Sequence, residues 1–404
     1  MGYGMPSKSI DSRRKIYLYY HDDVTRDRSG TSQFIRAISD ELSKHFSVDV
    51  FVYGDREEEI YDNGRYRIHV VKRPNIPLLR LIRRIPVLEK VYNSLVAINP
   101  RIYFESLAHS SPDGILCIDS YCGLFVSLFA KLRRIPVIFR PNDCLFDFGL
   151  QMSRTDFRAL GMMVVLFAAV AETLTLRNSD LIIASSEVAK SSLDRFYHVG
   201  PKSVVWAHTI SSKTSREQTK NPSIRSKFGI PQENKVVLFL GTADWFPNTL
   251  AIRYILRELA PKLADTSPDA TILIVGQGTE KYRSRVACNN VVIVGTVPDI
   301  HPYLETADIG IAPLSVSGGV NIKLIDYLSS GLVCLATERA AGTVKAQVGL
   351  FKVRLTEFDQ VLALLVGRRN LHEQREAIMA AASRLYSSSD TGQNALNRML
   401  ALMT

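Results

Sequence analysis

The residues best suited to chemistry lie close together in residues 312–342, which contain the glycine pair Gly318 and Gly319. The pair allows a backbone to approach a ligand closely. A predicted helix begins near Asn321, and its first N–H groups and dipole favour an anion. Lys323 adds a full positive charge in the first turn. This combination predicts a site for a nucleotide diphosphate, although a glycine-rich loop before a surface helix is the alternative.

A carboxylate in the first half of the chain is a candidate general base. Asp143 follows a predicted strand at 136–140, where it would remove a proton from an attacking hydroxyl across a cleft. The alternative is a turn, because Pro-Asn-Asp is a common turn sequence. Asp22 is a rival base, and His21 is a candidate for positioning an acceptor. His208 is a further candidate near the hinge, where a hydrogen-bonded core histidine is equally expected.

The elements that must position these residues alternate along the chain, which predicts parallel sheets built from βαβ units. The strands expected in the first half are 15–21, 47–53, 114–119, 136–140, 180–185 and 203–208, with a helix after Gly30. The strands expected in the second half are 235–241, 271–278, 290–295, 309–314 and 332–337, with helices at 248–262 and 321–330. Ligands of such sheets bind beyond the carboxyl ends of the strands, so two domains place the site in their cleft.

The domain boundaries follow from this repetition, because 404 residues exceed one compact core. We predict an N-terminal Rossmann-like domain over 1–210, a polar linker over 211–230 and a C-terminal Rossmann-like domain over 231–375. Residues 376–404 are expected to form a helix, for which a return to the N-terminal domain is considered.

The amino-acid composition indicates which classes of binding partner to expect. Lys and Arg exceed Asp and Glu by ten, which favours anionic partners. No recognition helix, zinc-finger spacing or RNP-type segment is present, so nucleic acid is not expected. The five cysteines contain no CxxC pair and are predicted to be reduced and mostly buried. No GxGxxG follows the first strand, which disfavours a dinucleotide-dependent dehydrogenase.

The pattern P-L-x₃-G-G-x₃-K-x₂-[E/D]-x₄-G is similar to the donor-site signature of GT-B glycosyltransferases, and the resemblance extends over 235–342. It implies an α/β fold with two Rossmann-like domains facing across a cleft, the C-terminal one binding a nucleotide-sugar and the N-terminal one an acceptor. The donor-binding residues that it implies are Thr296 and Val297 at the base, Asn321, Ile322 and Lys323 at the phosphates, Gly241 and Thr242 at the cleft, with Gly318, Gly319 and Asp326.

One position departs from the large retaining group of this fold. Those enzymes carry two glutamates spaced E-x₇-E, the first of which grips the donor sugar. Here Asp326 stands at the second position, but Gly318 stands at the first. The missing acid disfavours a retaining mechanism.

Residues 19–42 and 137–145 resemble the family of the inverting glucuronosyltransferase of xanthan assembly. That family uses the aspartate of an R-x-x-D motif as general base, which implies this role for Asp143 and leaves His21, Asp22, Gly30 and Arg140 as candidate acceptor-site residues. The implied reaction is inverting transfer of a sugar, glucuronate from UDP-glucuronate, to a lipid-linked oligosaccharide in exopolysaccharide or capsule assembly. The alternatives are a retaining GT-B enzyme with another UDP- or GDP-sugar, a sugar-nucleotide 2-epimerase and a UDP-binding scaffold.

No metal or cofactor is expected beyond the UDP-sugar donor, because no suitable DxD motif is present. Lys323 and the helix dipole would neutralise the leaving diphosphate instead.

An anionic membrane surface is a further expected partner. The segment 74–95 carries four cationic side chains among Leu and Ile and is predicted to rest on anionic lipid, with 159–169 beside it. An insert packed on the acceptor domain is the alternative. The apolar stretch 159–171 is shorter than the roughly 20 residues that span a bilayer, and the N-terminus lacks a signal-peptide core. The expected location is therefore the cytoplasmic face of the cell membrane.

Overall fold

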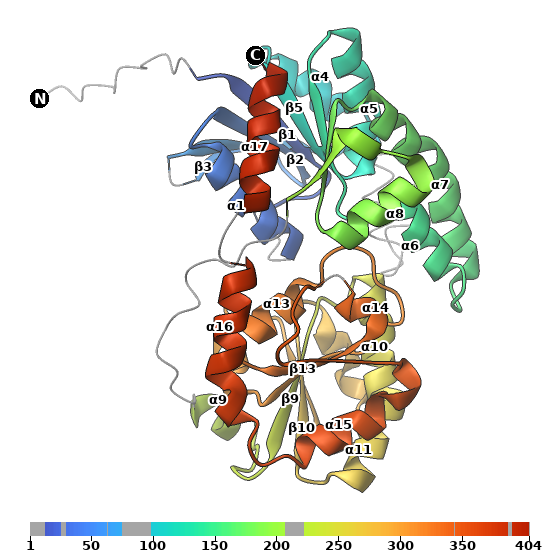
Figure 1. The fold of residues 1–404 in the computed structure, drawn as a ribbon, viewed down its shortest axis with the longest axis vertical. Coiled ribbons are helices and arrows are strands. Elements are labelled where there is room, and N and C mark those ends of the chain that lie inside the picture. The colour runs from blue at the N-terminus through green and yellow to red at the C-terminus, as the bar shows by residue number, and fades with distance from the viewer. Residues whose placement is uncertain are drawn as a thin grey trace, which may run out of the picture.

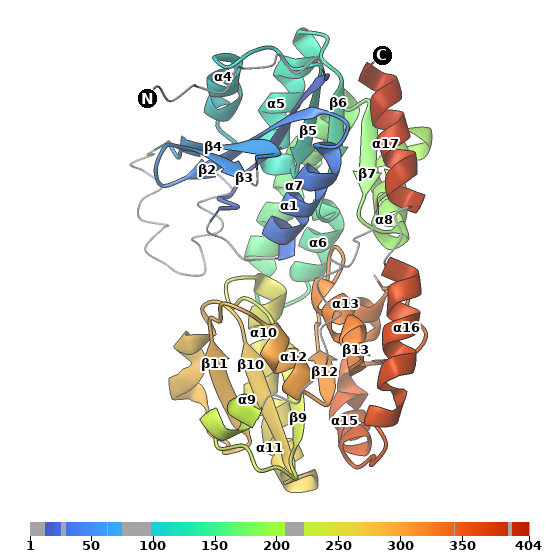
Figure 2. The same cartoon turned by 90° about the vertical axis from the view of Figure 1, so that its left-hand side faces the viewer.

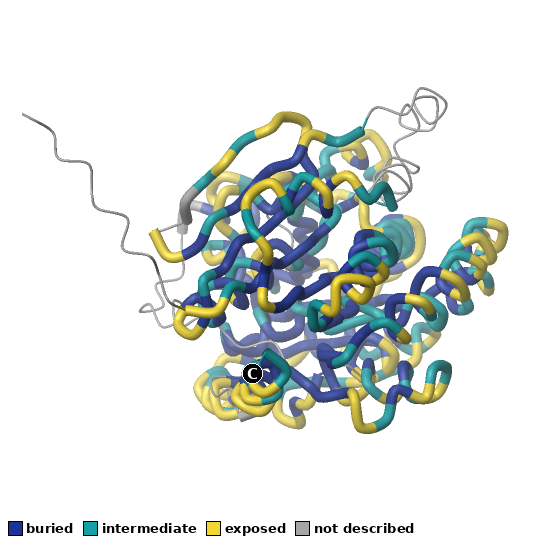
Figure 3. The backbone as a smooth tube through the Cα atoms, turned by 90° about the horizontal axis from the view of Figure 1, so that it is seen from above, coloured by how far each residue is buried: buried dark blue, intermediate teal, exposed yellow. Residues whose placement is uncertain are grey.

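A computed structural model describes residues 13–25, 30–62, 64–74, 98–206, 222–342, 344–386 and 390–403. The chain forms two α/β domains stacked along the long axis of the molecule, each built on its own sheet (Figure 1). This confirms the two parallel-sheet domains that the alternating pattern predicts. The buried residues concentrate in the strands, while the surrounding helices alternate between buried and exposed positions (Figure 3).

The N-terminal sheet has eight strands in the order β3-β4-β2-β1-β5-β6-β7-β8. They are β1 Lys15–Tyr20, β2 Ser47–Gly54, β3 Glu58–Asp62, β4 Tyr66–Lys72, β5 Gly114–Ile118, β6 Val137–Arg140, β7 Leu181–Ala184 and β8 Ser203–Val205. All pairs are parallel except β3 with β4. Sequence analysis missed this hairpin, whose edge strand β3 is rich in acidic residues and lacks an apolar run.

Helices cover both faces of this sheet (Figure 2). They are α1 Gly30–Leu42, α4 Arg101–Leu107, α5 Ser120–Leu132, α6 Leu145–Met152, α7 Arg158–Asn178 and α8 Glu187–Tyr197. The apolar side of α1 joins one core, which includes Phe34 and Ile38. Helices α4, α5, α7 and α8 contribute to the core on the opposite face, which includes Tyr103 and Val126.

The C-terminal sheet has six parallel strands in the order β11-β10-β9-β12-β13-β14. They are β9 Lys235–Leu240, β10 Ala270–Val275, β11 Val291–Gly295, β12 Ile309–Ala312, β13 Val333–Thr337 and β14 Leu350–Val353. The helices are α9 Pro222–Lys227, α10 Phe246–Tyr254, α11 Ala260–Thr266, α12 His301–Thr306, α13 Ile322–Ser329, α14 Glu338–Ala341, α15 Phe358–Val366 and α16 Arg375–Tyr386. A π-helical turn at Ile255–Leu259 joins α10 to α11, so the predicted helix at 248–262 runs longer than expected.

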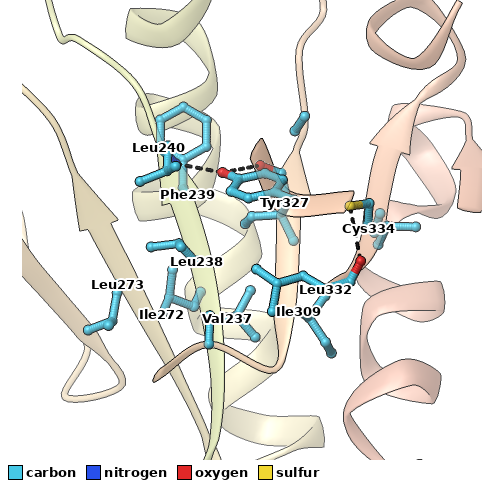
Figure 4. Close-up of a cluster of buried hydrophobic side chains, with 14 of the residues drawn as sticks. Val237, Leu238, Phe239, Leu240, Ile272, Leu273, Ile309, Tyr327, Leu332 and Cys334 are labelled. Carbon is cyan, nitrogen blue, oxygen red and sulfur yellow. Dashed lines mark hydrogen bonds between the residues drawn. The ribbon is translucent and has the colours of Figure 1, made fainter. Parts of the chain in front are cut away.

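A buried tyrosine fixes helix α13 against the sheet (Figure 4). The hydroxyl of Tyr327 accepts a hydrogen bond from the backbone N–H of Leu240 at 2.7 Å and donates to the carbonyl of Ile311 at 3.4 Å. Its ring lies against Gly310, where a Cβ atom would overlap it. These contacts therefore fix the position of α13 relative to the carboxyl ends of β9 and β12.

The final helix, α17 Asp390–Met403, packs against the N-terminal domain, whereas α16 packs in the C-terminal core. Arg398 Nη2 donates to the carbonyl of Pro201 at 2.7 Å. The predicted single helix over 376–404 is thus two helices in two domains. Within the predicted linker, Ile224 and Ile230 belong to the C-terminal core, so that domain begins earlier than 231.

We predict that Leu396→Ala lowers the free energy of unfolding by about 2–4 kcal/mol, because Leu396 is 2% exposed and its removal leaves a cavity under α17. Urea unfolding measures this change. Leu385→Ala on α16 is the control, since Leu385 is 43% exposed. Equal effects of the two substitutions would show that α17 does not stabilise the N-terminal domain.

Candidate active site

The predicted base and the predicted phosphate loop lie in direct contact across the domain boundary. A methyl group on Gly318 would lie 2.6 Å from both carboxylate oxygens of Asp143. A methyl group on Gly319 would overlap the carbonyl oxygen of Asn142 and Oδ1 of Asp143. The loop after β6 therefore approaches this backbone as closely as it does only because both residues are glycine.

Further contacts hold the two domains together around this point. The backbone N–H of Ser317 donates to Gln151 Oε1 of α6 at 3.2 Å. The rings of Phe148 and Trp245 stack with centroids 5.3 Å apart. A cavity beside the glycine loop is lined by residues of both domains, among them Ser192 and Arg339. The site is thus shared between the domains, as the cleft prediction requires.

The loop before α13 is braced by Asn321, which occupies the N-cap position. Its side chain makes no cap hydrogen bond. Instead, Nδ2 donates to Ser317 Oγ at 2.9 Å and to the carbonyl of Ala340 at 2.8 Å. Ile322 is the first helical residue. These hydrogen bonds of Asn321 therefore fix the conformation of the loop at its C-terminal end.

Lys323 lies in the first turn of α13 and reaches toward the end of β9. Its Nζ donates to Asn248 Oδ1 at 2.6 Å and lies 4.3 Å from the centre of the Phe239 ring. Burial lowers the pKa of Lys323 to about 7, because the charged form is desolvated. This ammonium group lacks a carboxylate partner in the described residues, so a diphosphate would supply the counter-charge.

Asn248 is a site residue that sequence analysis missed. Its Nδ2 donates to the carbonyl of Thr242 at 3.0 Å, and its side chain contacts Gly241. It thereby links Lys323 to both of the predicted cleft residues. The available signal was its place in the first turns of the helix that follows β9.

The remaining donor-site residues lie around this centre. Burial raises the pKa of Asp326 to about 7, and His301 partly offsets the shift. Thr296 is exposed just after β11, and its backbone N–H donates to Glu280 Oε1 at 2.5 Å. Val297 packs partly against the C-terminal core. Their predicted roles toward ribose and base stay predictions.

Asp143 has the electrostatics of a base that works near neutral pH. Burial raises its pKa to about 7, and the nearby Arg140 guanidinium partly offsets this effect. Glu172 of α7 positions the segment that follows, since its carboxylate accepts from the backbone N–H of Leu145 at 2.9 Å and of Phe146 at 3.2 Å. These two hydrogen bonds to α7 therefore hold the loop that carries Asp143 in place.

His21 forms a pair that the sequence did not reveal. His21 Nδ1 lies 2.5 Å from Asp119 Oδ2. Asp119 also accepts from the backbone N–H of Tyr121 and sits at a φ of 76°, a strained conformation typical of functional sites. Burial opposes the charged imidazole, but the charge and hydrogen bond of Asp119 prevail and raise the pKa of His21.

Asp22 is poorly suited to the role of rival base. It forms an ion pair with Arg73. Burial acts in the opposite direction, yet His21 and Arg73 together lower its pKa. A carboxylate held in its ionised, paired form is a weak proton acceptor.

Of the remaining candidates, the structure describes Gly30 and Arg140. Gly30 is the first residue of α1, and Arg140 ends β6. His208 lies outside the described residues. Within the described ranges no group of three or more His, Cys, Asp and Glu is arranged to hold a metal ion, and metal independence stays a prediction.

Part of the chain is similar to a known protein family and to one curated relative. Residues 234–379 match the family model described as Glycosyl transferases group 1. A phosphatidyl-myo-inositol mannosyltransferase of Mycolicibacterium smegmatis is 28% identical over 163 residues, which make up 38% of this chain and 41% of that protein. The chain thus matches about two fifths of that relative's length.

Solved structures show the fold over the whole chain. Sucrose-phosphate synthase from Thermosynechococcus elongatus matches with a TM-score of 0.70 at 17% identity, over 97% of this chain and all of that one. Anabaena HepE in complex with UDP and glucose matches at 0.68 and 14% identity, over 97% and 100%. WaaG, a glycosyltransferase of lipopolysaccharide biosynthesis, matches at 0.67 and 14% identity, over 96% and 99%. The fold is therefore GT-B.

We predict that Lys323→Met weakens the binding of UDP roughly 30- to 150-fold, which corresponds to the loss of a charge-assisted contact of about 2–3 kcal/mol. Calorimetric titration measures the affinity. Lys281→Met is the matched control, because Lys281 pairs with Asp244 on the surface of the same domain. Affinity of the wild type should also fall as pH rises above about 7, where Lys323 loses its proton. Unchanged affinity in Lys323→Met would refute the diphosphate site.

Proposed function

We propose, on the premise that residues 234–379 form a glycosyl transferases group 1 domain, that the protein is a glycosyltransferase that moves a sugar from a nucleotide diphosphate to an acceptor hydroxyl. The observation that carries the proposal is the contact between the Asp143 carboxylate and the loop of Gly318 and Gly319. In this proposal, Asp143 is the proton acceptor and lies next to the loop that would hold the diphosphate. The HepE complexes with UDP and with UDP-glucose support a nucleotide-sugar as donor.

The proposed reaction assigns each group one step. Asp143 takes the proton of the acceptor hydroxyl while that oxygen forms a bond to the anomeric carbon. The bond between the anomeric carbon and the diphosphate oxygen breaks on the opposite side, so configuration inverts. The start of α13 and Lys323 hold the charge of the departing diphosphate. A base with a pKa of about 7 is ionised often enough to act at neutral pH.

An inverting mechanism gains support from the crowding at Gly318. Retaining enzymes of this fold place a glutamate at the matching position. Any side chain on Gly318 would collide with the Asp143 carboxylate in this arrangement. We therefore propose inversion, with a retaining GT-B reaction as the alternative. The anomeric configuration of the product, read by NMR, decides between them.

The donor sugar and acceptor are proposed from the resemblance of residues 19–42 and 137–145. They are glucuronate from UDP-glucuronate and a lipid-linked oligosaccharide of exopolysaccharide or capsule assembly. Free sugar released without any acceptor would indicate the 2-epimerase instead. Binding of UDP without hydrolysis or transfer would indicate a scaffold.

A membrane surface is proposed as the place of action, and α7 supports it. Of the described helices, α7 alone is long and apolar enough to cross a membrane by length and composition, so the apolar segment is longer than the stretch 159–171 predicted from sequence. In the structure, 39% of its apolar window is buried. Its buried side packs on α6, where Gly161 contacts the backbone of Ser153. Its exposed apolar side chains are Met162, Met163, Leu166, Val170 and Leu174.

These exposed positions recur at intervals of about four residues, so they form one stripe along α7. Helix α7 lies at the outer edge of the N-terminal domain (Figure 1). Arg158 and Arg177 stand at its two ends. An apolar stripe flanked by cations suits the interface of an anionic lipid layer. The predicted basic segment beyond Pro74 lies outside the described residues.

We expect Asp143→Asn to reduce sugar transfer by about 10²–10⁴-fold, because the amide cannot accept the hydroxyl proton. Its affinity for UDP should stay within about twofold of wild type. Transfer of labelled sugar to a lipid extract measures the first, and calorimetry the second. Asp156→Asn, at an exposed position of the same domain, is the matched control and should retain full activity. Loss of transfer in Asp22→Asn but not in Asp143→Asn would move the base to Asp22.

With the donor saturating, the wild-type rate should rise with pH and level off above about 7, since Asp143 must lose its proton to act. A pH profile of kcat at saturating donor measures this dependence. A rate that instead falls as pH rises toward 7 would exclude Asp143 as the base.

We predict that Met163→Glu combined with Leu166→Glu lowers binding to vesicles of phosphatidylcholine and phosphatidylglycerol at least tenfold, because two apolar side chains, each contributing about 1.5–3 kcal/mol, no longer enter the lipid. Co-sedimentation measures the bound fraction. Leu364→Glu on α15 is the control, since Leu364 is 71% exposed on the other domain. Equal binding of wild type and the double variant would exclude the α7 stripe as the contact.

A further inference from the structure

Arg140 carries a buried positive charge that the structure leaves unsatisfied. Its side chain is among the largest that are fully buried, with 1% exposure. Nε and Nη2 have no hydrogen-bond partner. No carboxylate of the described residues lies within ion-pair distance of it, and burial lowers its pKa to about 9. Buried guanidinium groups are normally paired, because an unpaired one costs several kcal/mol.

The side chain lies between the sheet and the start of α1. Arg140 ends β6 two residues after Ile138, which packs in the same core as α1. Its guanidinium carbon lies 3.4 Å from the centre of the ring of Phe34, which begins the second turn of α1. Helix α1 has 13 residues and no acidic residue in its first turn. The positive end of its dipole therefore adds to the charge of Arg140.

We propose that Arg140 and the amino end of α1 form an anion subsite in the N-terminal domain, which binds a carboxylate or phosphate group of a substrate. The Nε and Nη2 edge of a guanidinium presents two parallel N–H groups, which match the two oxygens of such an anion. The Asp143 carboxylate partly offsets the effect of burial on the pKa of Arg140.

The proposal rests on the proposed function in one respect, namely that the anion belongs to a glycosyl donor or acceptor. Arg140 precedes the proposed base, Asp143, by three residues, so an anion bound to Arg140 would lie close to that base. The subsite would therefore orient a substrate with its reacting end near Asp143. A sugar acid in the donor and a phosphate in the acceptor share this chemistry.

The subsite is tested by anion binding, independently of transfer. With UDP saturating the donor site and ionic strength held constant, inorganic phosphate and D-glucuronate are titrated against thermal stability. We expect at least one to raise the midpoint of wild type by several degrees and to leave Arg140→Gln unchanged. Arg133→Gln, which removes an exposed charge at the far end of α5, should respond like wild type. Equal responses of all three proteins would overturn the proposal.

The ligand-free proteins give a second, independent measurement. If Arg140 serves a ligand, Arg140→Gln should be as stable as wild type or more so, because an unpaired buried charge is removed. A midpoint several degrees lower would assign Arg140 a structural role and overturn the proposal.

Transfer assays identify which substrate carries the anion. If it is the donor, Arg140→Gln should lose at least tenfold of the preference for UDP-glucuronate over UDP-glucose. If it is the acceptor, the variant should lose at least tenfold of the preference for phosphorylated over unphosphorylated acceptors. An unchanged preference in both assays would count against the subsite. Absence of any transfer by the wild type would defeat the proposed function, while the anion titrations would still decide this inference.

Discussion

The close approach of the Asp143 carboxylate to the backbone of Gly318 and Gly319 is the constraint on which the rest of the site depends. Only residues without a Cβ atom permit it. A hydrogen bond from the backbone N–H of Leu145 to Glu172 holds the loop after β6 in this position. A hydrogen bond from Asn321 to Ser317 holds the glycine loop. Each of these supports is itself buried or partly buried, so the two halves of the site are held by the cores of two separate domains.

Several ionisable groups of the site are buried, and burial shifts their pKa values. Burial raises the pKa of Asp143 and Asp326 to about 7 and lowers that of Lys323 to the same region. Arg140 stacks on Phe34, but its Nε and Nη2 lack a hydrogen-bond partner in the described residues. Groups of this kind are costly to a fold and cluster where a ligand later supplies the missing charge. Binding of an anion at these groups, as proposed above, would supply the missing charge.

The chain path couples the domains that form this site. Helix α17 returns to the N-terminal sheet after α16 has finished the C-terminal core. The polypeptide thus crosses between domains twice, once before α9 and once between α16 and α17. Aromatic pairs such as Phe148 with Trp245 add contact near the cleft. These contacts hold the facing loops of the two domains together.

The sequence by itself determined the two sheets, the strands that carry the loops and the glycine-lysine segment at 318–323, because these depend on local periodicity and spacing. The resemblance of residues 137–145 to the R-x-x-D motif of a known family also singled out Asp143. Only the tertiary structure revealed the pairing of His21 with Asp119, the link from Lys323 to Asn248 and the unsatisfied guanidinium of Arg140. These relations join residues 75 or more positions apart, or depend on which groups are withdrawn from water, and no local pattern encodes either property.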